Sequence, residues 1–572
     1  MNHQQPGNGD RPANSEATCT GAKAQRLVDA ELLQIGRGPR LGDGDTDTDT
    51  DNEGDDSGSS RRDFLSLMGF SLGAVGLGAG CRAPVMHAIP LPMATPEMVP
   101  GVSLTYATTC GACPSSCTLL VKQRDGRPIK IDGNPDSPLF GGGTCATGQA
   151  ALLSLYDSSR LRGPHWNGQP STWAEIDERV AAALSSLGAP GGAGAGGQQI
   201  VLLSGTITSP STRALIAAWA RRYPNFRHVV VDAVSAGALR EATRRTFGRA
   251  VVPHYRFDKA RVVVALEADF LGTWLSPVEF ARGYAAIRRA SGAAPAMHVQ
   301  IESGYSVTGS NADLRLPVPP SALGAVAAAL YARLAQRAGG AVAAANFPVA
   351  DDPLTEEGLS PKQLDAIADH LWRARGVSLV VSGSGDADTQ TLVAGMNILL
   401  GNIGHTVDVA RPSLQRQGDD AALATLIAQM TDGQVGALMI YGANPGYDHP
   451  DGPAFLEGLK HVPLSIAFAS HVDETSAYVQ AICPDHHFLE SWGDAEPIED
   501  TLSLAQPLIA PLFGTRAAPE SLLRWLGGRD SHHDFVRSFW REAIFPRQTV
   551  ETDFDAFWDR TLQGGLLRTA LT

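Results

Sequence analysis

Four of the seven cysteines lie close together near the N-terminal side of the chain, with the spacing C-x2-C-x3-C-x27-C. They are Cys110, Cys113, Cys117 and Cys145. Cysteines three and four positions apart share one tight turn, from which thiolates converge on an inorganic core more readily than they pair with each other. Four thiolates suit a [4Fe–4S] cluster or a structural Zn²⁺. Iron–sulfur is the favoured interpretation, and zinc or, in an exported protein, two disulfides are the alternatives.

The segment between the third and fourth cysteines predicts the element that positions them. "LLVKQRDGRPIKIDGNPDSP" contains two short strand patterns joined by an Asp125-Gly126 turn and followed by an Asn134-Pro135 turn. We therefore expect a small β-rich domain over residues 100–163, with the cysteines at one edge.

A segment that resembles an export signal precedes the cysteines. Residues 60–81 contain Arg61 and Arg62 followed by a Gly-rich apolar run, which resembles a twin-arginine signal, the route for proteins folded around a cofactor. The apolar run is shorter than the roughly 20 residues that span a bilayer. Cys81 follows "LGAG" and is either an acylated lipoprotein cysteine or an ordinary cysteine near a cleavage site. The expected location is the periplasmic side of the bacterial inner membrane.

Length and charge narrow the class of protein. A chain of 572 residues with 43% hydrophobic residues is long enough for two or three domains. Residues 1–59 are polar, and eight acidic side chains fall within residues 43–56, so we predict a disordered acidic leader. The net charge of −14 and the absence of a Lys/Arg-rich run exclude nucleic acid as a partner.

Beyond residue 165, buried strand patterns alternate with amphipathic helix patterns, which predicts parallel sheets covered on both faces. The Pro/Gly/Ala-rich segments 187–197 and 338–353 are the expected loops or boundaries, and we expect the second to separate two α/β halves, 164–340 and 354–525. The expected strands are 200–204, 228–231, 261–266, 298–301, 378–382 and 437–441, and the expected helices are 211–222, 236–247, 323–337, 362–373 and 421–431.

The order of cysteine loop, "DGRPIKIDGNPDSP", glycine-rich loop, fourth cysteine and "GQAALLSLYDSSRL" resembles the N-terminal iron–sulfur domain of the molybdopterin oxidoreductase family. The resemblance implies an α/β fold with two Rossmann-like domains, which in that family cradle two pterin dinucleotides.

Longer stretches narrow the resemblance. "FGRAVVPHYRFDKARVVVALEADFLGTWLSPVEFARGYA", "ESGYSVTGSNADLRLPV" and "HVDETSAYVQAICPDHHFLESWGDAEPIED" are similar to the large iron–sulfur subunit of alternative complex III, a membrane-bound quinol oxidoreductase. In that family this region has lost molybdenum. The resemblance implies three kinds of partner: a ferredoxin-like iron–sulfur subunit, a polytopic quinone-binding membrane subunit and c-type cytochrome subunits. Membrane association would then run through the complex or a lipid anchor.

Two departures from that family matter. Its members often lack the N-terminal cysteines, whereas this chain has all four. The sequence also ends after "FDAFWDRTLQGGLL", where the ferredoxin-like part would begin, so we expect those clusters on another polypeptide. Residues 526–572 are too short for the C-terminal β-barrel of catalytic relatives, and we predict a helical extension there.

The positions at which catalytic relatives bind molybdenum are poorly matched in this sequence. Catalytic relatives commonly carry a basic residue two places after the fourth cysteine, where this chain has Thr147. Ser235, or Asp232, in "DAVSAG" is a vestigial molybdenum-ligand position, but Ser235 also fits a helix N-cap. Molybdopterin guanine dinucleotide is therefore the less favoured expectation.

Two histidine groups resemble metal or acid–base sites by composition alone. His486 and His487 lie near Cys483, Glu490 and Asp494, but the spacing fits no standard metal signature and favours a structural role. His254 and Tyr255 in "VVPHYRFDKA" are interpreted as loop packing.

The sequence thus favours an electron-transfer or scaffold subunit of a quinol-oxidising respiratory complex, with one iron–sulfur cluster and no substrate reaction of its own. The alternatives are an active molybdopterin enzyme acting on a small inorganic or sulfur compound, and a purely structural subunit.

Overall fold

The computed structural model describes residues 99, 101–188, 197–289, 294–339 and 359–568. The predicted leader (1–59) and signal segment (60–81), with Arg61, Arg62 and Cys81, lie outside these residues. Within them, no helix has the length and apolarity that a membrane crossing requires.

A three-stranded antiparallel sheet forms the N-terminal module. Its strands are β1 (Leu104–Thr109), β2 (Thr118–Arg124) and β3 (Arg127–Gly133), followed by helix α3 (Ala146–Leu155). Asp125 and Gly126 both have positive φ, which suits the two-residue hairpin turn that pairs Arg124 with Arg127. The predicted hairpin is confirmed.

The first lobe is built on a seven-stranded sheet with the order β5-β4-β16-β15-β14-β6-β7. Strands β16, β15, β14, β6 and β7 are parallel, and β4 and β5 add an antiparallel edge. The strands and helices are β4 (His165–Trp166), β5 (Gln169–Pro170), α4 (Trp173–Gly188), β6 (Gln199–Ser204), α5 (Pro210–Arg222), β7 (Phe226–Val230), α12 (Asp420–Thr431), β14 (Val435–Tyr441), α13 (Pro445–Asp448), α14 (Gly452–Leu459), β15 (Leu464–Phe468), η4 (Ser476–Tyr478), β16 (Ala481–Ile482), η5 (Phe488–Glu490) and α15 (Ala518–Trp525).

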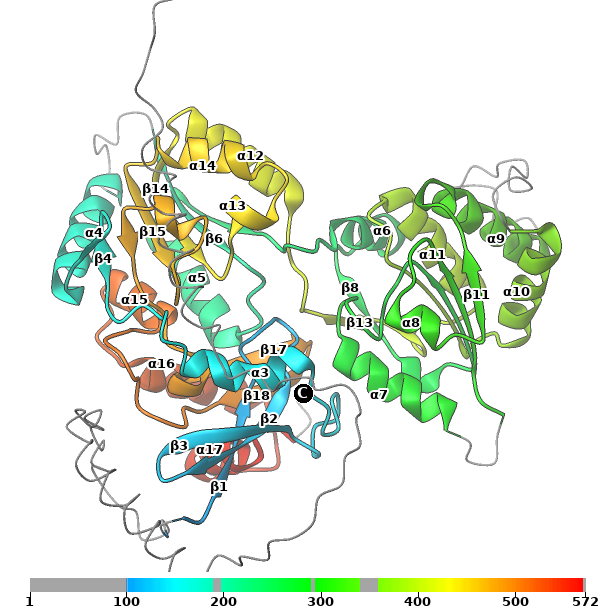
Figure 1. Ribbon diagram of the computed structural model, residues 1–572, viewed down its shortest axis with the longest axis horizontal. Coiled ribbons are helices and arrows are strands. Elements are labelled where there is room, and N and C mark those ends of the chain that lie inside the picture. The colour runs from blue at the N-terminus through cyan, green and yellow to red at the C-terminus, as the bar shows by residue number, and fades with distance from the viewer. Residues whose placement is uncertain (1–98, 100, 189–196, 290–293, 340–358, 569–572) are drawn as a thin grey trace, which may run out of the picture. The chain divides into compact units, whose positions relative to one another are not determined.

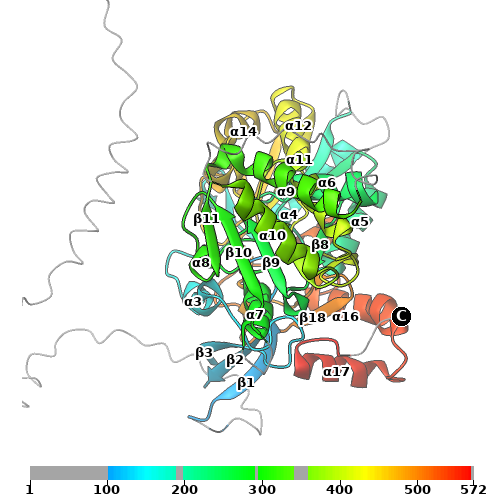
Figure 2. The same ribbon diagram turned by 90° about the vertical axis from the view of Figure 1, so that its right-hand side faces the viewer.

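The second lobe is built on a parallel sheet with the order β11-β10-β9-β12; Figure 2 shows β11, β10 and β9 in this order. Its elements are α6 (Gly237–Phe247), η1 (Phe257–Lys259), β9 (Val262–Leu266), α7 (Pro277–Arg288), β10 (Met297–Glu302), α8 (Val307–Ser310), β11 (Leu314–Pro317), η2 (Pro320–Ala322), α9 (Leu323–Arg337), α10 (Pro361–Arg373), β12 (Ser378–Ser382) and α11 (Ala387–Leu399).

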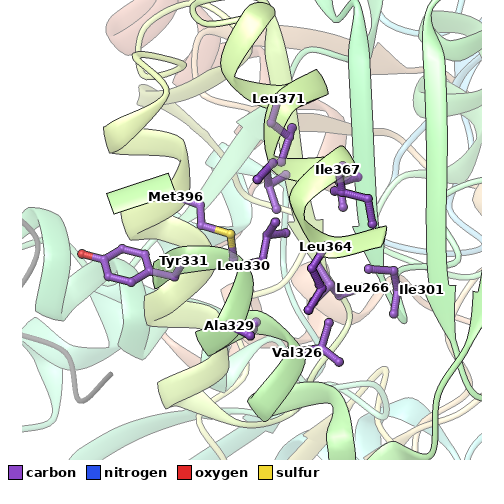
Figure 3. Packing of buried hydrophobic residues seen from close by; sticks show 14 of the residues in the cluster. Leu266, Ile301, Val326, Ala329, Leu330, Tyr331, Leu364, Ile367, Leu371 and Met396 are labelled. Atoms are coloured by element: carbon purple, nitrogen blue, oxygen red, sulfur yellow. The ribbon is translucent and has the colours of Figure 1, made fainter. Parts of the chain in front are cut away.

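The central strands β9 and β14 consist of apolar or small residues and are buried on both faces, whereas β10 also buries His298, Gln300 and Glu302. In β9, Val262, Val264 and Leu266 pack against α9, α10 and α11, as Figure 3 shows for Leu266. The intervening Val263 and Ala265 belong to a separate core on the other face. Two-faced burial is what continuous apolar strands indicate, and the predicted fold class is confirmed.

A fourth, antiparallel sheet has the order β18-β17-β13-β8. It consists of β8 (Val252–Tyr255), β13 (Val407–Ser413), β17 (Gly493–Ile498) and β18 (Thr501–Ala505). The helices that follow are α16 (His532–Phe539), the π-helix η6 (Trp540–Ile544), η7 (Phe545–Arg547) and α17 (Phe554–Gly564). Helix α17 contacts β1, and Asn134 Nδ2 donates to the Gly564 carbonyl, so this part of the chain returns to the N-terminal module.

The two lobes do not follow one another along the chain as expected. Strand β6 pairs directly with β14, more than 200 residues later, while the second lobe lies between them in sequence (Figure 1, β6 in cyan and β14 in yellow). Residues near 340, the expected boundary, fall between α9 and α10, which share one core. Hydrophobic periodicity predicted the helices and strands. The order of the strands depends on pairing between distant segments, and periodicity carries no information about that pairing.

Candidate functional site

Three of the four cysteines lie on the loop that joins β1 to β2. The backbone N–H of Cys110 donates to the Cys117 carbonyl (2.8 Å), and Ser116 N donates to the Cys113 carbonyl (3.2 Å). Ser116 adopts a positive φ of 49°, which reverses the chain between Cys113 and Cys117. Cys110 and Cys117 are buried, while Cys113 is exposed. The loop therefore forms one compact turn that presents three thiols.

The fourth cysteine begins helix α3. Cys145 is the N-cap residue, and its Sγ accepts a hydrogen bond from Gly148 N (3.3 Å). A Cβ placed on Gly148 would lie 3.7 Å from Cys145 Sγ and 4.0 Å from Cys110 Sγ, so these two sulfurs are at most 7.7 Å apart. The positive end of the helix favours negative charge on the sulfur. The predicted fourth cysteine thus joins the others in space despite the 27-residue interval.

Burial and mutual repulsion determine the protonation of these thiols. Burial raises the pKa of Cys110 to about 11, and the neighbouring Cys113 and Cys145 add to the rise. Burial raises the pKa of Cys117 further, with additional repulsion from the other three cysteines. Only a cation can make such a group of thiolates stable at neutral pH, because metal binding displaces their protons.

None of the five cysteines that the structure describes is in a disulfide. Within the described ranges, no three or more Cys, His, Asp or Glu side chains are grouped as a site for a metal ion. Four thiolates can hold either Zn²⁺ or a [4Fe–4S] cluster, so zinc stays an alternative to the iron–sulfur interpretation.

A buried ion pair joins the cysteine module to the first lobe. Arg160 donates to both carboxylate oxygens of Glu490, at 3.2 and 2.6 Å, and to the Leu155 carbonyl. The two side chains are 1% and 0% exposed. Glu490 also accepts from the backbone N–H groups of His487 and Leu512. Because all of these partners are satisfied, the pair fixes α3 against the segment that precedes β17.

A cavity of about 700 Å³ lies between the cysteine loop and the carboxyl ends of β6, β7, β14 and β15. From β6 the chain continues to β7 on one side, and from β14 to β15 on the other, so the sheet has its topological switch point between β6 and β14. Ligands of open α/β sheets bind at such points. Gly205 and Gly442 follow the two strands, and a Cβ on Gly205 would come within 2.5 Å of the Gly442 carbonyl oxygen.

The cysteine loop forms one wall of this cavity. Thr109, Cys110 and Cys113 line it, and Ser116 Oγ lies 2.9 Å from Thr208 Oγ1 in the loop after β6. Gly111 is required here, because a Cβ would lie 2.6 Å from Cβ of Phe488. The cavity and the thiol group are therefore parts of one site.

The two residues predicted as vestigial molybdenum positions have other roles. Ser235 is exposed, donates to Asp420 Oδ2 (2.7 Å) and accepts from Gly237 N (2.9 Å); the N-cap of α6 is Ala236 rather than Ser235. Asp232 lines the cavity, but its Oδ2 accepts from Thr206 Oγ1, Gln417 N and Gly418 N. Asp232 therefore ties together the two crossings of the chain between the lobes.

The residues of the "CPDHHFLESWGD" segment do not converge on a metal. Cys483 is in the core of the first lobe, and burial raises its pKa to about 12. His486 Nδ1 lies 2.6 Å from Thr515 Oγ1, and His487 Nε2 lies 3.0 Å from Ser154 Oγ. Glu490 pairs with Arg160. These contacts fit the structural interpretation of the segment.

The His254 side chain also has a partner within the protein. Its Nε2 lies 2.5 Å from Glu279 Oε1 in a buried pair, and the adjacent Tyr255 ring packs against Trp274. Both residues pack rather than form an exposed acid–base site, but they lie in strand β8 and not in the predicted loop.

The carboxyl edge of the second sheet is filled by its own side chains. Glu302, 2% exposed, pairs with Arg315 (2.6 Å) and accepts from Ser306 Oγ (2.6 Å). Asp269 accepts from the N–H and hydroxyl of Thr308. A Cβ on Gly309 would lie 1.9 Å from Glu302 Oε1. The space beyond the ends of β9 and β10 is therefore occupied.

Sequence reasoning missed two residues of the site. Arg160 lies within the motif "GQAALLSLYDSSRL", but nothing in its sequence position indicates a buried pair with Glu490, which is 330 residues away. Asp494 lies in a segment whose composition resembles a metal site, but its partners are Ser209, Ser211 and Trp540. No sequence interval could reveal those partners, since Asp494 and Ser209 are 285 residues apart.

Comparison with known proteins agrees with this geometry. Residues 104–157 match the model of the molybdopterin oxidoreductase Fe4S4 domain. The chain is 27% identical over 465 residues to the menaquinone reductase, molybdopterin-binding-like subunit of Nitratidesulfovibrio vulgaris, which covers 76% of this chain and 66% of the relative, just under two thirds of its length.

A shorter match of 32% identity over 96 residues links the chain to the molybdopterin-containing subunit of an arsenate respiratory reductase from Shewanella sp., covering 17% of this chain and 11% of that one. Among solved structures, acetylene hydratase from Pelobacter acetylenicus superimposes with a TM-score of 0.57 at 12% identity, covering 74% of this chain and 69% of that one. This last likeness concerns the fold alone.

Proposed function

Since the chain is related to the molybdopterin oxidoreductases and carries their Fe4S4 domain, we propose that it is an electron-transfer subunit of a quinone-linked respiratory complex similar to alternative complex III. The match to a menaquinone reductase subunit over three quarters of the chain supports a respiratory role. The whole complex, its substrates and its direction of electron flow belong to this proposal.

Cys110, Cys113, Cys117 and Cys145 hold one [4Fe–4S] cluster in this proposal. The single observation that carries it is the gathering of the four thiols inside the matched Fe4S4 domain, with Cys110 and Cys145 sulfurs no more than 7.7 Å apart. Such a cluster supplies one-electron redox chemistry. The chain positions it: Gly148 N donates to the Cys145 sulfur, and the apolar core around Phe140, Leu119 and Ile131 limits water on one side.

The cluster works without a molybdenum cofactor in this proposal. The filled carboxyl edge of the second sheet supports this, because a pterin dinucleotide would have to displace the Glu302–Arg315 pair and the Asp269 contacts. The second candidate function, an active molybdopterin enzyme acting on a small inorganic or sulfur compound, has one observation in its favour: the cavity of about 700 Å³ beside the cysteine loop is large enough for a cofactor.

The partners in this proposal are a ferredoxin-like iron–sulfur subunit, a polytopic quinone-binding membrane subunit and c-type cytochrome subunits. The proposal also includes export by the twin-arginine route to the periplasmic side of the inner membrane. Arg61 and Arg62 belong to the signal, and Cys81 is a lipid attachment point.

Metal analysis of anaerobically purified protein tests the proposal. About four irons and no molybdenum per chain are expected. Molybdenum with pterin would favour the second candidate, and the absence of iron would leave a structural subunit.

A pair of cysteine variants tests the ligand assignment. Cys113→Ser should abolish or strongly alter the visible iron–sulfur absorbance, because an exposed ligand is replaced while the fold around it stays intact. Cys483→Ser is the matched control, since Cys483 is buried in another core and should leave the absorbance per folded chain unchanged. Unaltered absorbance in Cys113→Ser would contradict the assignment.

A further inference from the structure

A carboxylate occupies the N-terminus of the helix that follows the switch-point strand β6. Helix α5 begins at Pro210, and Asp494 reaches it from β17. Asp494 Oδ1 accepts from the hydroxyls of Ser209 (2.5 Å) and Ser211 (2.7 Å). Its Oδ2 accepts from Ser211 N (3.3 Å) and from Trp540 Nε1 (2.9 Å). Asp494 is 7% exposed and lines the cavity.

The first turn of α5 has no N–H group left for a ligand. Pro210 has no backbone N–H, Ser211 N donates to Asp494, and Thr212 N donates to Ser209 Oγ (3.0 Å). Arg213 N donates to the Ser209 carbonyl. Cofactor phosphates in open α/β folds bind to these N–H groups at the start of the helix after the first strand. A phosphate at this place would compete with Asp494 for Ser211 N and with Ser209 for Thr212 N.

The Asp494 carboxyl group also takes the place of a phosphate as hydrogen-bond acceptor. Burial raises the pKa of Asp494, and the hydrogen bonds from Ser209, Ser211 and Trp540 oppose that rise. The chain therefore supplies its own acceptor where a cofactor phosphate would accept from the helix N-terminus.

Two other helix starts, one in each lobe, are satisfied in a similar manner. Asp386 accepts from the N–H and hydroxyl of Thr389 at the start of α11. Asp419 accepts from Ala422 N at the start of α12. These carboxylates are exposed N-caps of ordinary type. Asp494 differs because it comes from a distant strand and is buried in the cavity wall.

We propose that Asp494 replaces a cofactor phosphate at the N-terminus of α5, so that the first lobe folds without a dinucleotide and is closed to phosphate-bearing ligands. This inference rests on the proposed function in one respect, the absence of a bound pterin dinucleotide. It explains how a cavity of cofactor size persists beside the cysteine loop without the groups that bind a cofactor's phosphates.

Thermal unfolding with inorganic phosphate and pyrophosphate as probes tests the inference. For the wild-type holoprotein, Tm should change no more with phosphate than with sodium chloride of equal ionic strength. Asp494→Ala should have a lower Tm, because Ser209, Ser211 and Trp540 lose their acceptor. Phosphate should then raise the Tm of this variant by roughly 1–3 °C in a saturable manner.

Asp386→Ala is the matched control, because it removes an N-cap carboxylate from a helix start outside the cavity. Its Tm should fall, and phosphate should give no saturable rise. If Asp494→Ala folds but does not respond to phosphate beyond the control, the inference is overturned.

A second measurement keeps the inference falsifiable if Asp494→Ala does not fold. Equilibrium dialysis of the wild-type holoprotein with guanosine diphosphate should show no saturable binding, and saturable binding overturns the inference. The outcomes also separate the two proposals. A phosphate-insensitive Asp494→Ala variant in protein without molybdenum sinks this inference alone, whereas molybdenum and pterin in the purified protein sink the proposed function.

Discussion

The carboxyl edges of the two parallel sheets share the same backbone geometry but differ in the side chains that lie beyond the strands. In each, a glycine after one strand lies against the backbone of its neighbour: a Cβ on Gly205 would lie 2.5 Å from the Gly442 carbonyl oxygen, and one on Gly383 would lie 2.4 Å from that of Glu267. Beyond the glycines, the first edge opens on a cavity walled by the cysteine loop, whereas Glu302 and Asp269 fill the second. Shared strand geometry therefore does not preserve a binding site; the side chains beyond the strands decide it.

The largest expected effect concerns the ion pairs at the two edges. Arg160→Met leaves Glu490 buried and unpaired, which should lower the free energy of unfolding by about 3–5 kcal/mol. Arg315→Met leaves Glu302 unpaired, but Arg315 is 24% exposed and water can replace it in part, so about 1–2 kcal/mol is expected. Urea unfolding followed by circular dichroism measures both.

The double variant Arg160→Met/Glu490→Leu is the control for the first edge. It removes both charges and should recover most of the loss. Equal losses of unfolding free energy in Arg160→Met and Arg315→Met would contradict the difference in burial between the two ion pairs.

The glycines offer a test in which the two edges should behave alike. Gly205→Ala and Gly383→Ala each push a methyl group into a carbonyl oxygen of the adjacent strand end, which should cost about 1–3 kcal/mol. Only Gly205→Ala should change the iron–sulfur absorption spectrum, because Gly205 lines the cavity beside Cys110. An altered spectrum in Gly383→Ala would break the distinction between the edges.

The two edges should respond to pH in opposite directions. Burial alone would raise the pKa of Glu302, but hydrogen bonds from Ser306 and Arg315 outweigh it and hold the pKa below 4.5. Its contribution is therefore present above pH 4.5 and lost as the pH falls through the lowered pKa. Burial raises the pKa of Asp485, in the cavity wall, from 3.8 to about 7. The folded state then holds a proton that the unfolded state has released, so stability falls as the pH rises from about 4 to 7.

Isosteric amides separate these two effects. Asp485→Asn keeps an acceptor for the backbone N–H groups of Ala518 and His486, and should flatten the decline in Tm between pH 4 and 7. Glu302→Gln should flatten the acid limb below pH 4.5. Tm profiles that match the wild type in both variants would rule out these groups as the source of the pH dependence.

The smallest effect is expected at the predicted molybdenum position. Ser235→Ala removes an exposed hydroxyl and should change stability by about 0.5 kcal/mol or less, with iron content unchanged. Asp232→Ala removes the acceptor of three hydrogen bonds at the crossing between the lobes and should cost more, about 1–3 kcal/mol. Differential scanning calorimetry measures both, and a larger loss in Ser235→Ala would restore a role for that residue.

The elements were predictable where the signal is local. Strand 378–382 and helix 323–337 have the predicted bounds, since buried apolar runs and helical periodicity survive in any surrounding. The turn at Asp125-Gly126 was predictable because its dihedral angles restrict the residue types. All four members of the cysteine group were predicted from residue type and spacing.

What sequence could not provide is the partner of each distant residue. The antiparallel sheet that joins β8 and β13 to β17 and β18 is not predicted from the sequence, because its strands carry few continuous apolar residues. Asp232 and Asp494 each accept from donors far away in sequence, Gln417 at 185 residues and Ser209 at 285 residues. Residues of this kind are acidic and polar in sequence, and only the fold distinguishes a ligand from a structural acceptor.

The insertion of the second lobe between β6 and β14 has a consequence during synthesis. At about 5–20 residues per second, a ribosome needs on the order of 10–50 s after finishing β6 to complete β14. During that interval one edge of β6 has no neighbour, and nascent chains with such an edge are prone to misassociation. A chaperone that binds the emerging first lobe until the inserted lobe has been made would protect this step, and ribosome profiling of chaperone-bound nascent chains would detect it between these two strands.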